Sequence, residues 1–138
     1  MTPIYTASAA STGDARNGHV QSTDGILDLD VRVPKEMGGA GGATNPEQLF
    51  AAGYAACFHS ALKLVAGKAG VDMTDSEVVA DVSIGDNRSG GFQLAVQLEV
   101  TIPGTDEATA QQLADRAHQV CPYSNATRGN VDVAITVA

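Results

Sequence analysis

Hydrophobic and polar residues alternate along several stretches of the chain, which is the pattern of a strand with one buried face. The clearest stretch is 92–102, where every second residue from Phe92 to Ile102 is apolar. Another begins after Asp24-Gly25, a dipeptide that favours a tight hairpin turn. The pattern predicts six strands in all, at 4–12, 18–23, 26–33, 77–84, 92–102 and 131–138.

A long helix is predicted over residues 46–66. Asn45 can cap its start, and Pro46 suits the first helical position. Either Gly67 or Gly70 is expected to end it. The helix is apolar on nearly every side, which is typical of a buried helix. One sheet of so small a chain covers only one of these sides, so we expect a second subunit to cover the other.

Thr105 is predicted to cap a second helix, whose apolar stripe ends at Cys121 and which stops near Pro122. The order is therefore three strands, a helix, two strands, a helix and a strand. Long hairpins with two main helices predict an α+β fold with a mainly antiparallel sheet. No internal repeat or linker interrupts the chain, so we expect a single domain over residues 1–138.

Composition and charge exclude several classes of function. The chain has 138 residues, of which 43% are hydrophobic, so a folded core is expected. Its net charge is −8 with no run of Lys or Arg, which argues against a nucleic-acid partner. The first residues lack the basic start of a secretory signal. The apolar stretch 49–65 contains His59 and Lys63, so we expect no membrane span and a cytoplasmic protein.

The chain has two cysteines, Cys57 and Cys121, each in an apolar setting. Each could be a small buried hydrophobic residue, as most free cysteines are. Together they could form a structural disulfide or, as a reducing compartment favours, a redox pair. A metal site with His59 and His118 would have unusual ligand spacings. A hydrolase with a Cys–His pair is also open, in which His118 approaches Cys57 through the fold.

Few charged residues could activate a buried thiol, because the chain has only eight Lys and Arg. Arg16 lies in a turn-rich stretch, where a solvated loop arginine is the simpler interpretation. Glu47 lies in the first turn of the long helix, where a carboxylate complements the helix dipole. The residues alone thus describe a buried two-thiol protein with a redox role and no defined substrate.

Two longer motifs carry a family resemblance. The stretches "GGAGGATNPEQLFAAGYAACF" (38–58) and "AHQVCPYSNATRGN" (117–130) resemble the Ohr branch of the OsmC/Ohr family, the organic hydroperoxide resistance proteins. Arg16 to Gly18 is similar to the family's N-terminal region, and the resemblance covers essentially the whole chain. It implies an intertwined homodimer in which the central helices are buried between sheets.

The resemblance also implies an activity, that of a thiol peroxidase for organic hydroperoxides, including lipid-derived ones. Cys57 matches the peroxidatic cysteine and Cys121 the resolving cysteine, which together form a disulfide during turnover. Arg16 and Glu47 match the active-site arginine and carboxylate. The family takes its electrons from an external dithiol, typically lipoyl groups of dehydrogenase complexes, and needs no metal, flavin or haem.

Several further expectations follow from this assignment. Arg16 would favour the Cys57 thiolate and place a donor at the peroxide oxygens, while Glu47 would orient Arg16. Glu47 and Cys57 lie ten residues apart on one helix, about 15 Å along its axis. We expect two helices that cross antiparallel in a dimer to bring Glu47 of one subunit near Cys57 of the other; the alternative is that the long Arg16 side chain bridges the distance within one subunit. Apolar walls for an alkyl chain are expected from Leu49, Phe50, Tyr54 and Phe58, although packing explains these residues equally well.

Two alternatives from other classes stay open at this point. The chain could be a non-catalytic binding domain that a Cys57–Cys121 disulfide stabilises. It could also be a hydrolase that uses Cys57 on esters or thioesters, without a sulfenic acid.

Overall fold

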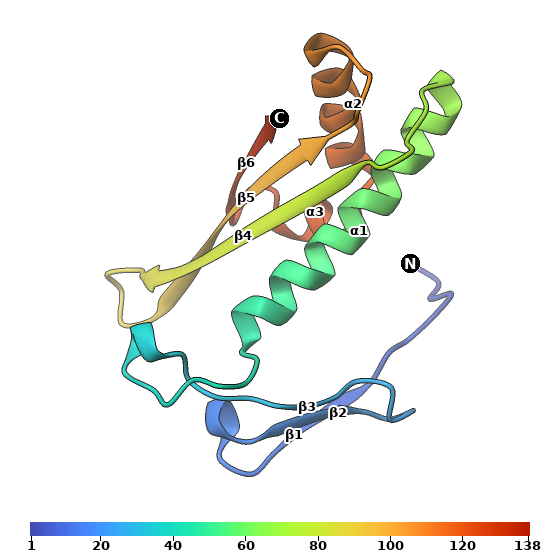
Figure 1. The fold of residues 1–138 in the computed structure, drawn as a ribbon. Coiled ribbons are helices and arrows are strands. Elements are labelled where there is room, and N and C mark those ends of the chain that lie inside the picture. The colour runs from blue at the N-terminus through green and yellow to red at the C-terminus, as the bar shows by residue number, and fades with distance from the viewer. The chain divides into compact units, whose positions relative to one another are not determined.

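The structure is a computed structural model that describes residues 1–138 (Figure 1). The chain forms two compact units, residues 1–49 and residues 50–138. The single domain expected over the whole chain stays a prediction. The α+β class is confirmed, with three-stranded sheets and α-helices in one chain.

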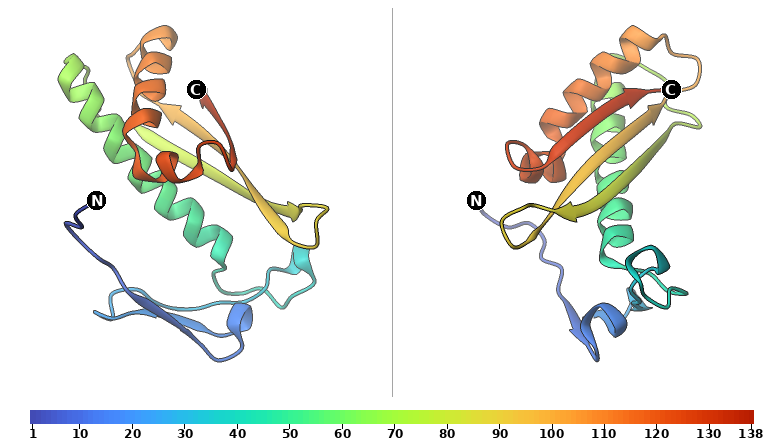
Figure 2. Two further views of the ribbon diagram at one scale, coloured as in Figure 1. Left: turned by 180° about the vertical axis from the view of Figure 1, so that it is seen from behind. Right: turned by 90° about the vertical axis from the view of Figure 1, so that its left-hand side faces the viewer.

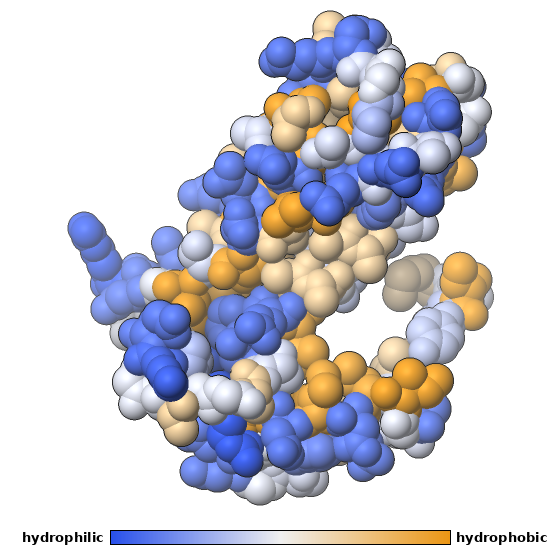
Figure 3. Space-filling model, viewed as in Figure 1, coloured by the Kyte–Doolittle hydropathy of each residue, from blue (hydrophilic) through white to orange (hydrophobic).

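The first unit contains an antiparallel sheet in the order β1–β2–β3. Its strands are shorter than predicted, because turns and two 3-10 helices take up the flanking residues: β1 is Ala9–Thr12, β2 is His19–Ser22 and β3 is Asp28–Asp30, and the 3-10 helices are Ala15–Asn17 and Lys35–Met37. Val31 is buried, but Leu27 and Leu29 of the same predicted apolar face are exposed. Apolar side chains therefore lie at the surface of this unit, where Figure 3 shows them in orange.

Helix α1 spans Pro46–Ala69. Asn45 caps it as predicted, since its side-chain oxygen accepts a hydrogen bond of 2.8 Å from the Gln48 N–H. The helix ends at Gly70, whose φ of 71° is the left-handed conformation of a glycine C-cap. At 24 residues it is longer than predicted and could cross a bilayer by length and composition, a property that buried core helices share. Six of its residues are buried in the second unit, which agrees with a core helix: Tyr54, Phe58, Ala61, Leu62, Val65 and Ala66.

The second unit is built on the sheet β4–β5–β6. Strand β4 (Glu77–Asp86) pairs antiparallel with β5 (Phe92–Thr101), and β6 (Asp132–Val137) pairs parallel with β5. The mainly antiparallel expectation is confirmed, with this one parallel pair. Parallel neighbours need a crossover, and helices α2 (Glu107–Val120) and α3 (Pro122–Thr127) provide it.

One prediction around the second helix was wrong and one is confirmed. Asp106, not Thr105, caps α2, because its carboxylate accepts two bonds from Thr109, from the N–H at 3.0 Å and from the hydroxyl at 2.8 Å. Helix α2 ends at Val120, near Pro122 as predicted, and Pro122 also begins α3, since its fixed φ suits a first helical position. Cys121 is the extended residue between the two helices.

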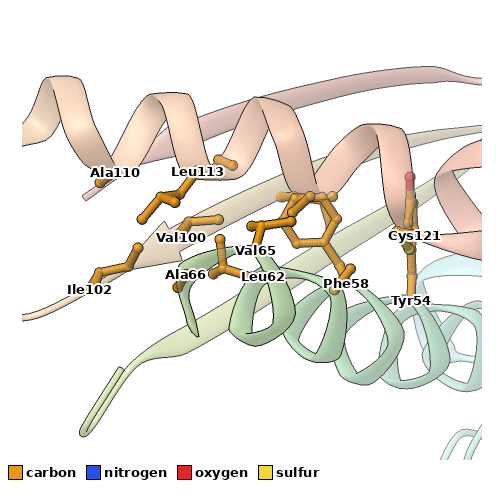
Figure 4. Close-up of a cluster of buried hydrophobic side chains, with 14 of the residues drawn as sticks. Tyr54, Phe58, Leu62, Val65, Ala66, Val100, Ile102, Ala110, Leu113 and Cys121 are labelled. Atoms are coloured by element: carbon orange, nitrogen blue, oxygen red, sulfur yellow. The ribbon is translucent and has the colours of Figure 1, made fainter. Parts of the chain in front are cut away.

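Helices α1 and α2 cover the same face of the β4–β5–β6 sheet, as both views of Figure 2 show. The predicted inner face of β5 is confirmed from Leu94 to Val100, whereas Phe92, at the hairpin end, is 74% exposed. Figure 4 shows the resulting core, in which the side chains of α1, β5 and α2 interdigitate. Cys121 belongs to this core, and the partly buried Cys57 packs against it.

Candidate functional site

The fold brings together the two thiols, which are 64 residues apart in the sequence. The Cys121 thiol donates toward the Cys57 sulfur, and the two Sγ atoms lie 3.7 Å apart. Both cysteines are free. Hydrogen bonds hold the Cys121 backbone on both sides, from its N–H to the Ala117 carbonyl at 2.8 Å and from the Asn125 N–H to its carbonyl at 3.0 Å. The two sulfurs thus meet at a fixed junction of α2 and α3.

The surroundings of Cys57 act against its ionisation. Burial raises the pKa of the Cys57 thiol, because a thiolate loses solvation in apolar surroundings. The backbone N–H of Tyr123 donates to the sulfur and acts in the opposite direction, while the Cys121 thiol raises the pKa further. Residues 50–138 supply no cation to the sulfur. A reactive thiolate therefore needs a positive charge from elsewhere.

The side chain of Tyr123 lies across α1 on the N-terminal side of Cys57. Its ring stacks on Tyr54, with centroids 5.6 Å apart, and meets the edge of Phe50 at 6.1 Å. A Cβ atom at Gly53 would stand 2.8 Å from the Tyr123 hydroxyl, so only glycine leaves room there. Tyr123 belongs to the 117–130 motif, but its contact with Cys57 was not predicted from the sequence. The only signal for this contact is that Tyr123 lies two residues after Cys121.

A chain of buried polar groups lies beside the two thiols. The Tyr54 hydroxyl is hydrogen-bonded to Ser124 Oγ at 2.9 Å and to Thr127 Oγ1 at 3.2 Å. Ser124 Oγ also bonds His118 Nδ1 at 2.8 Å. Burial lowers the pKa of His118, and the nearby Arg128 lowers it further against the opposing effect of Asp115. These bonds connect α1, α2 and α3, and no buried side-chain polar atom lacks a partner.

Arg16 and Glu47 form the second pair. The guanidinium donates two bonds to the carboxylate, from Nη1 to Oε2 at 3.0 Å and from Nη2 to Oε1 at 2.9 Å. This is the pairing expected from the sequence, in the bidentate geometry that gives arginine its orientational specificity. The hydrogen bonds from Arg16 hold the pKa of Glu47 below its usual range, and Glu47 raises the pKa of Arg16. Arg16 is therefore an oriented cation rather than a freely solvated loop residue.

The loop that carries Arg16 is held by Arg32, which sequence reasoning missed. Arg32 donates to the carbonyl of Gly18 at 2.9 Å and to that of Asn17 at 3.2 Å. The Asn17 side chain in turn accepts the Val33 N–H at 3.1 Å. Ala15 takes a positive φ of 49° in the same loop. This second arginine shapes the turn from which Arg16 reaches Glu47.

The remaining candidate residues divide by burial. Tyr54 and Phe58 are fully buried and act as core residues in the chain, whereas Leu49 and Phe50 are half-buried. A groove of about 550 Å³ opens beside Phe50 and is lined on its apolar side by Phe92, Leu94 and Val131. The assignment of all four residues to a substrate pocket stays a prediction.

The four residues weighed as metal ligands do not form one cluster. His59 Nε2 bonds Ser76 Oγ at 2.9 Å, whereas His118 Nδ1 bonds Ser124. The two thiols thus contact each other while the two imidazoles are engaged by different hydroxyls.

Comparison with known proteins shows the family of the chain. Residues 39–136 match the family of OsmC-like proteins. An organic hydroperoxide resistance protein of Xanthomonas axonopodis pv. citri is 53% identical over 137 residues, covering 98% of this chain and 95% of that protein. The organic hydroperoxide resistance protein OhrB of Bacillus subtilis is 47% identical over 131 residues, with coverage of 94% and 95%. The crystal structure of an organic hydroperoxide resistance protein from Legionella pneumophila has a TM-score of 0.94 at 50% identity and covers 99% of both chains. The chain therefore belongs to the OsmC/Ohr family, as its two cysteine-bearing motifs implied.

Proposed function

We propose that this protein is a cysteine-based thiol peroxidase that reduces organic hydroperoxides to alcohols and thereby serves organic hydroperoxide resistance. The observation that carries the proposal is the 3.7 Å approach of the Cys57 and Cys121 sulfurs inside an apolar core. The relatives named as organic hydroperoxide resistance proteins support the substrate class. Apolar surroundings also suit an alkyl peroxide better than hydrogen peroxide.

The reaction consumes one hydroperoxide and two thiols. The Cys57 thiolate attacks the outer peroxide oxygen, the O–O bond breaks, and the alkoxide leaves as the alcohol after it takes up a proton. Cys57 becomes a sulfenic acid. The Cys121 thiol then attacks the Cys57 sulfur, so that an S–S bond forms and water leaves. Because a disulfide has an S–S bond of about 2.05 Å, the 3.7 Å distance between the two sulfurs must shorten by less than about 2 Å.

Recycling needs two electrons from outside the chain. An external dithiol attacks the disulfide, forms a mixed disulfide and closes into its own cyclic disulfide, which returns both cysteines to thiols. We propose a lipoyl group on a partner protein as this dithiol. No metal, flavin or haem takes part in these steps, and a reducing cytoplasm suits both thiols.

Arg16 supplies the missing positive charge in this proposal. Burial raises the pKa of Cys57, so a permanently charged guanidinium beside the sulfur would restore the thiolate. The bidentate bond that Arg16 donates to Glu47 would fix the direction in which the guanidinium points. The same donors would stabilise the negative charge that develops on the peroxide oxygens. Leu49 and Phe50 would hold the alkyl chain.

The proposed assembly is a homodimer in which each site uses both subunits. Glu47 and Cys57 lie on one helix, and ten residues correspond to about 15 Å of rise. An antiparallel crossing of two α1 helices would bring the Arg16–Glu47 pair of one subunit to Cys57 of the other. Apolar residues that the single chain leaves exposed, among them Leu29 at 39% and Leu64 at 52%, support a second copy as the cover.

The two cysteines should have separable roles. Cys57→Ser should abolish the consumption of cumene hydroperoxide in the presence of dithiothreitol, because no other residue attacks the O–O bond. Cys121→Ser should reduce one equivalent and then retain Cys57 as a sulfenic or higher acid, visible in the intact mass. Substantial turnover by Cys57→Ser would refute the assignment. A hydrolase would instead cleave esters without a sulfenic acid, and a disulfide-stabilised binding domain would show no turnover with wild-type protein.

A dithiol should sustain turnover better than a monothiol. At equal thiol concentration, dihydrolipoamide should support a higher steady-state rate than 2-mercaptoethanol, because its second thiol resolves the mixed disulfide intramolecularly. The check is the rate of peroxide consumption with each reductant over a range of concentrations. Equal rates would remove the support for a lipoyl donor and leave the peroxide chemistry itself untouched.

Arg16→Ala should make the Cys57 thiol harder to ionise. In the Cys121→Ser background, the pH profile of iodoacetamide alkylation reports Cys57 alone, and its midpoint should rise by about 1–3 pH units when the cation is lost. Arg16 lowers the pKa of Glu47, so Glu47 stays ionised over the pH range in which Cys57 titrates. The stability that the Arg16–Glu47 ion pair contributes is lost only as pH falls through that lowered pKa. Arg116→Ala removes the same charge from an exposed position on α2 and should leave the midpoint unchanged. If both substitutions shift the profile equally, Arg16 has no specific role.

Complementation should reveal the shared site. Glu47→Ala and Cys57→Ser subunits, each impaired alone, should regain activity when they are refolded together, because a mixed dimer contains one site with both residues intact. Random mixing places an intact site at about a quarter of all positions, so about a quarter of wild-type activity is expected. The oligomeric state of the mixture is measured alongside by light scattering. Dimers without a gain in activity would mean that Glu47 serves its own Cys57, and monomers would remove the proposed assembly.

A further inference from the structure

We infer that Tyr54 is a positioning residue for the resolving step, whose hydroxyl holds α3 against α1 and thereby keeps Cys121 within reach of Cys57. The inference rests on the proposed peroxidase function and concerns only its second half, the formation of the disulfide. Tyr54 was expected from the sequence either to line an alkyl pocket or to pack in the core; its side chain is fully buried and its hydroxyl faces α3.

Two matched contacts join the same two segments, α1 and residues 121–124. Tyr54 precedes Cys57 by three residues on α1, so the two side chains lie on one face of the helix. Ser124 follows Cys121 by three residues at the start of α3. The Tyr54 hydroxyl meets Ser124 Oγ at 2.9 Å, and the Cys57 sulfur meets the Cys121 sulfur at 3.7 Å. The two contacts are successive links between α1 and the segment 121–124.

The hydroxyl contact is the stronger of these two links. A thiol–thiol contact is a weak hydrogen bond, whereas Tyr54 makes two bonds between hydroxyls, to Ser124 and to Thr127. All three hydroxyl residues are buried, so breaking these two bonds would leave the buried Tyr54 hydroxyl without a partner. The Tyr54 hydroxyl thus contributes more to the seating of α3 than the sulfurs do while both are reduced.

The hydrogen-bonded hydroxyls of Tyr54, Ser124 and Thr127 form a clamp that also reaches the other side of Cys121. Ser124 Oγ bonds His118 Nδ1 at 2.8 Å, and His118 lies three residues before Cys121 on α2. One hydroxyl group therefore ties together residues on both flanks of the resolving cysteine, and Tyr54 anchors that hydroxyl to α1. The Cys121 backbone bonds to Ala117 and Asn125 make the segment move as one piece.

This clamp matters because the sulfenic acid has two fates. Attack by Cys121 gives the disulfide at a rate that depends only on how often the thiol is in position. Attack on a second hydroperoxide gives a sulfinic acid, which thiols do not reduce, at a rate proportional to the peroxide concentration. A looser α3 lowers the effective concentration of Cys121 at the sulfenic acid and leaves the first attack of Cys57 unaffected.

The test is Tyr54→Phe, which removes the hydroxyl and keeps the ring that stacks on Tyr123. Reduced protein receives increasing cumene hydroperoxide without reductant, and intact mass gives the ratio of sulfinic acid to disulfide. At each peroxide concentration this ratio should rise by about two- to tenfold, the factor that corresponds to the net contribution of one hydrogen bond. The rate at which the first equivalent is consumed should stay within about twofold of wild type, since Cys57 keeps its contacts.

Two further variants make the test decisive. Ser76→Ala removes the 2.9 Å bond from His59, which also ties α1 to another segment, and should leave the ratio at the wild-type value. Thr127→Val removes the second bond of the Tyr54 hydroxyl, should raise the ratio in the same direction, and serves as the test if Tyr54→Phe does not fold.

The inference would be overturned if Tyr54→Phe and Thr127→Val both gave the wild-type ratio of sulfinic acid to disulfide. It would also be overturned if these variants consumed the first equivalent of hydroperoxide more slowly by the same factor. An equal rise in Ser76→Ala would also overturn it, because the effect would then be a general loss of stability. Failure of the proposed function looks different, since wild-type protein would then form neither disulfide nor sulfinic acid.

Discussion

The contact between two sulfurs inside an apolar core is the constraint on which the rest of this structure depends. Burial favours the neutral thiol, whereas attack on a peroxide requires the thiolate. Hydrogen-bond donors and charges from distant segments of the chain favour the thiolate. The Tyr123 N–H reaches the Cys57 sulfur from the start of α3, and the proposed cation, Arg16, is oriented by a carboxylate at the start of α1. An apolar site and a thiolate can coexist only when such donors and charges stabilise the thiolate.

Much of the fold could be predicted because its signals are local. Alternation along β5 and the Asn45 cap of α1 depend on neighbouring residues only, and both are confirmed. The parallel pairing of β6 with β5 could not be predicted, because alternation identifies a face but not a strand's direction. The Asp106 cap was missed for a similar reason, since Thr105 and Asp106 are both good caps and only the geometry decides between them.

Less of the site than of the fold could be predicted from local sequence patterns. Composition reduced the choice to two thiols, but their proximity, and the pairing of Arg16 with Glu47, came from a family resemblance rather than from spacing. The buried hydroxyls were not predicted. A tyrosine in an apolar helix is most simply a core residue, and its hydrogen bonds to Ser124 and Thr127 depend on a helix 70 residues away in sequence. Tertiary polar contacts of this kind have no local signature.

The close approach of Tyr123 to Gly53 has a consequence for anyone who wishes to make this protein more robust. Replacing a glycine inside a helix by alanine ordinarily gains about 1 kcal/mol of helix stability. At position 53 the added methyl would collide with the Tyr123 hydroxyl, so the Tyr123 ring, which stacks on Tyr54, would have to shift. Packing thus retains a glycine one turn before the reactive residue of α1, and thermostabilisation of the helix has to begin at its other glycine, Gly67, where an added Cβ would meet nothing within 4 Å.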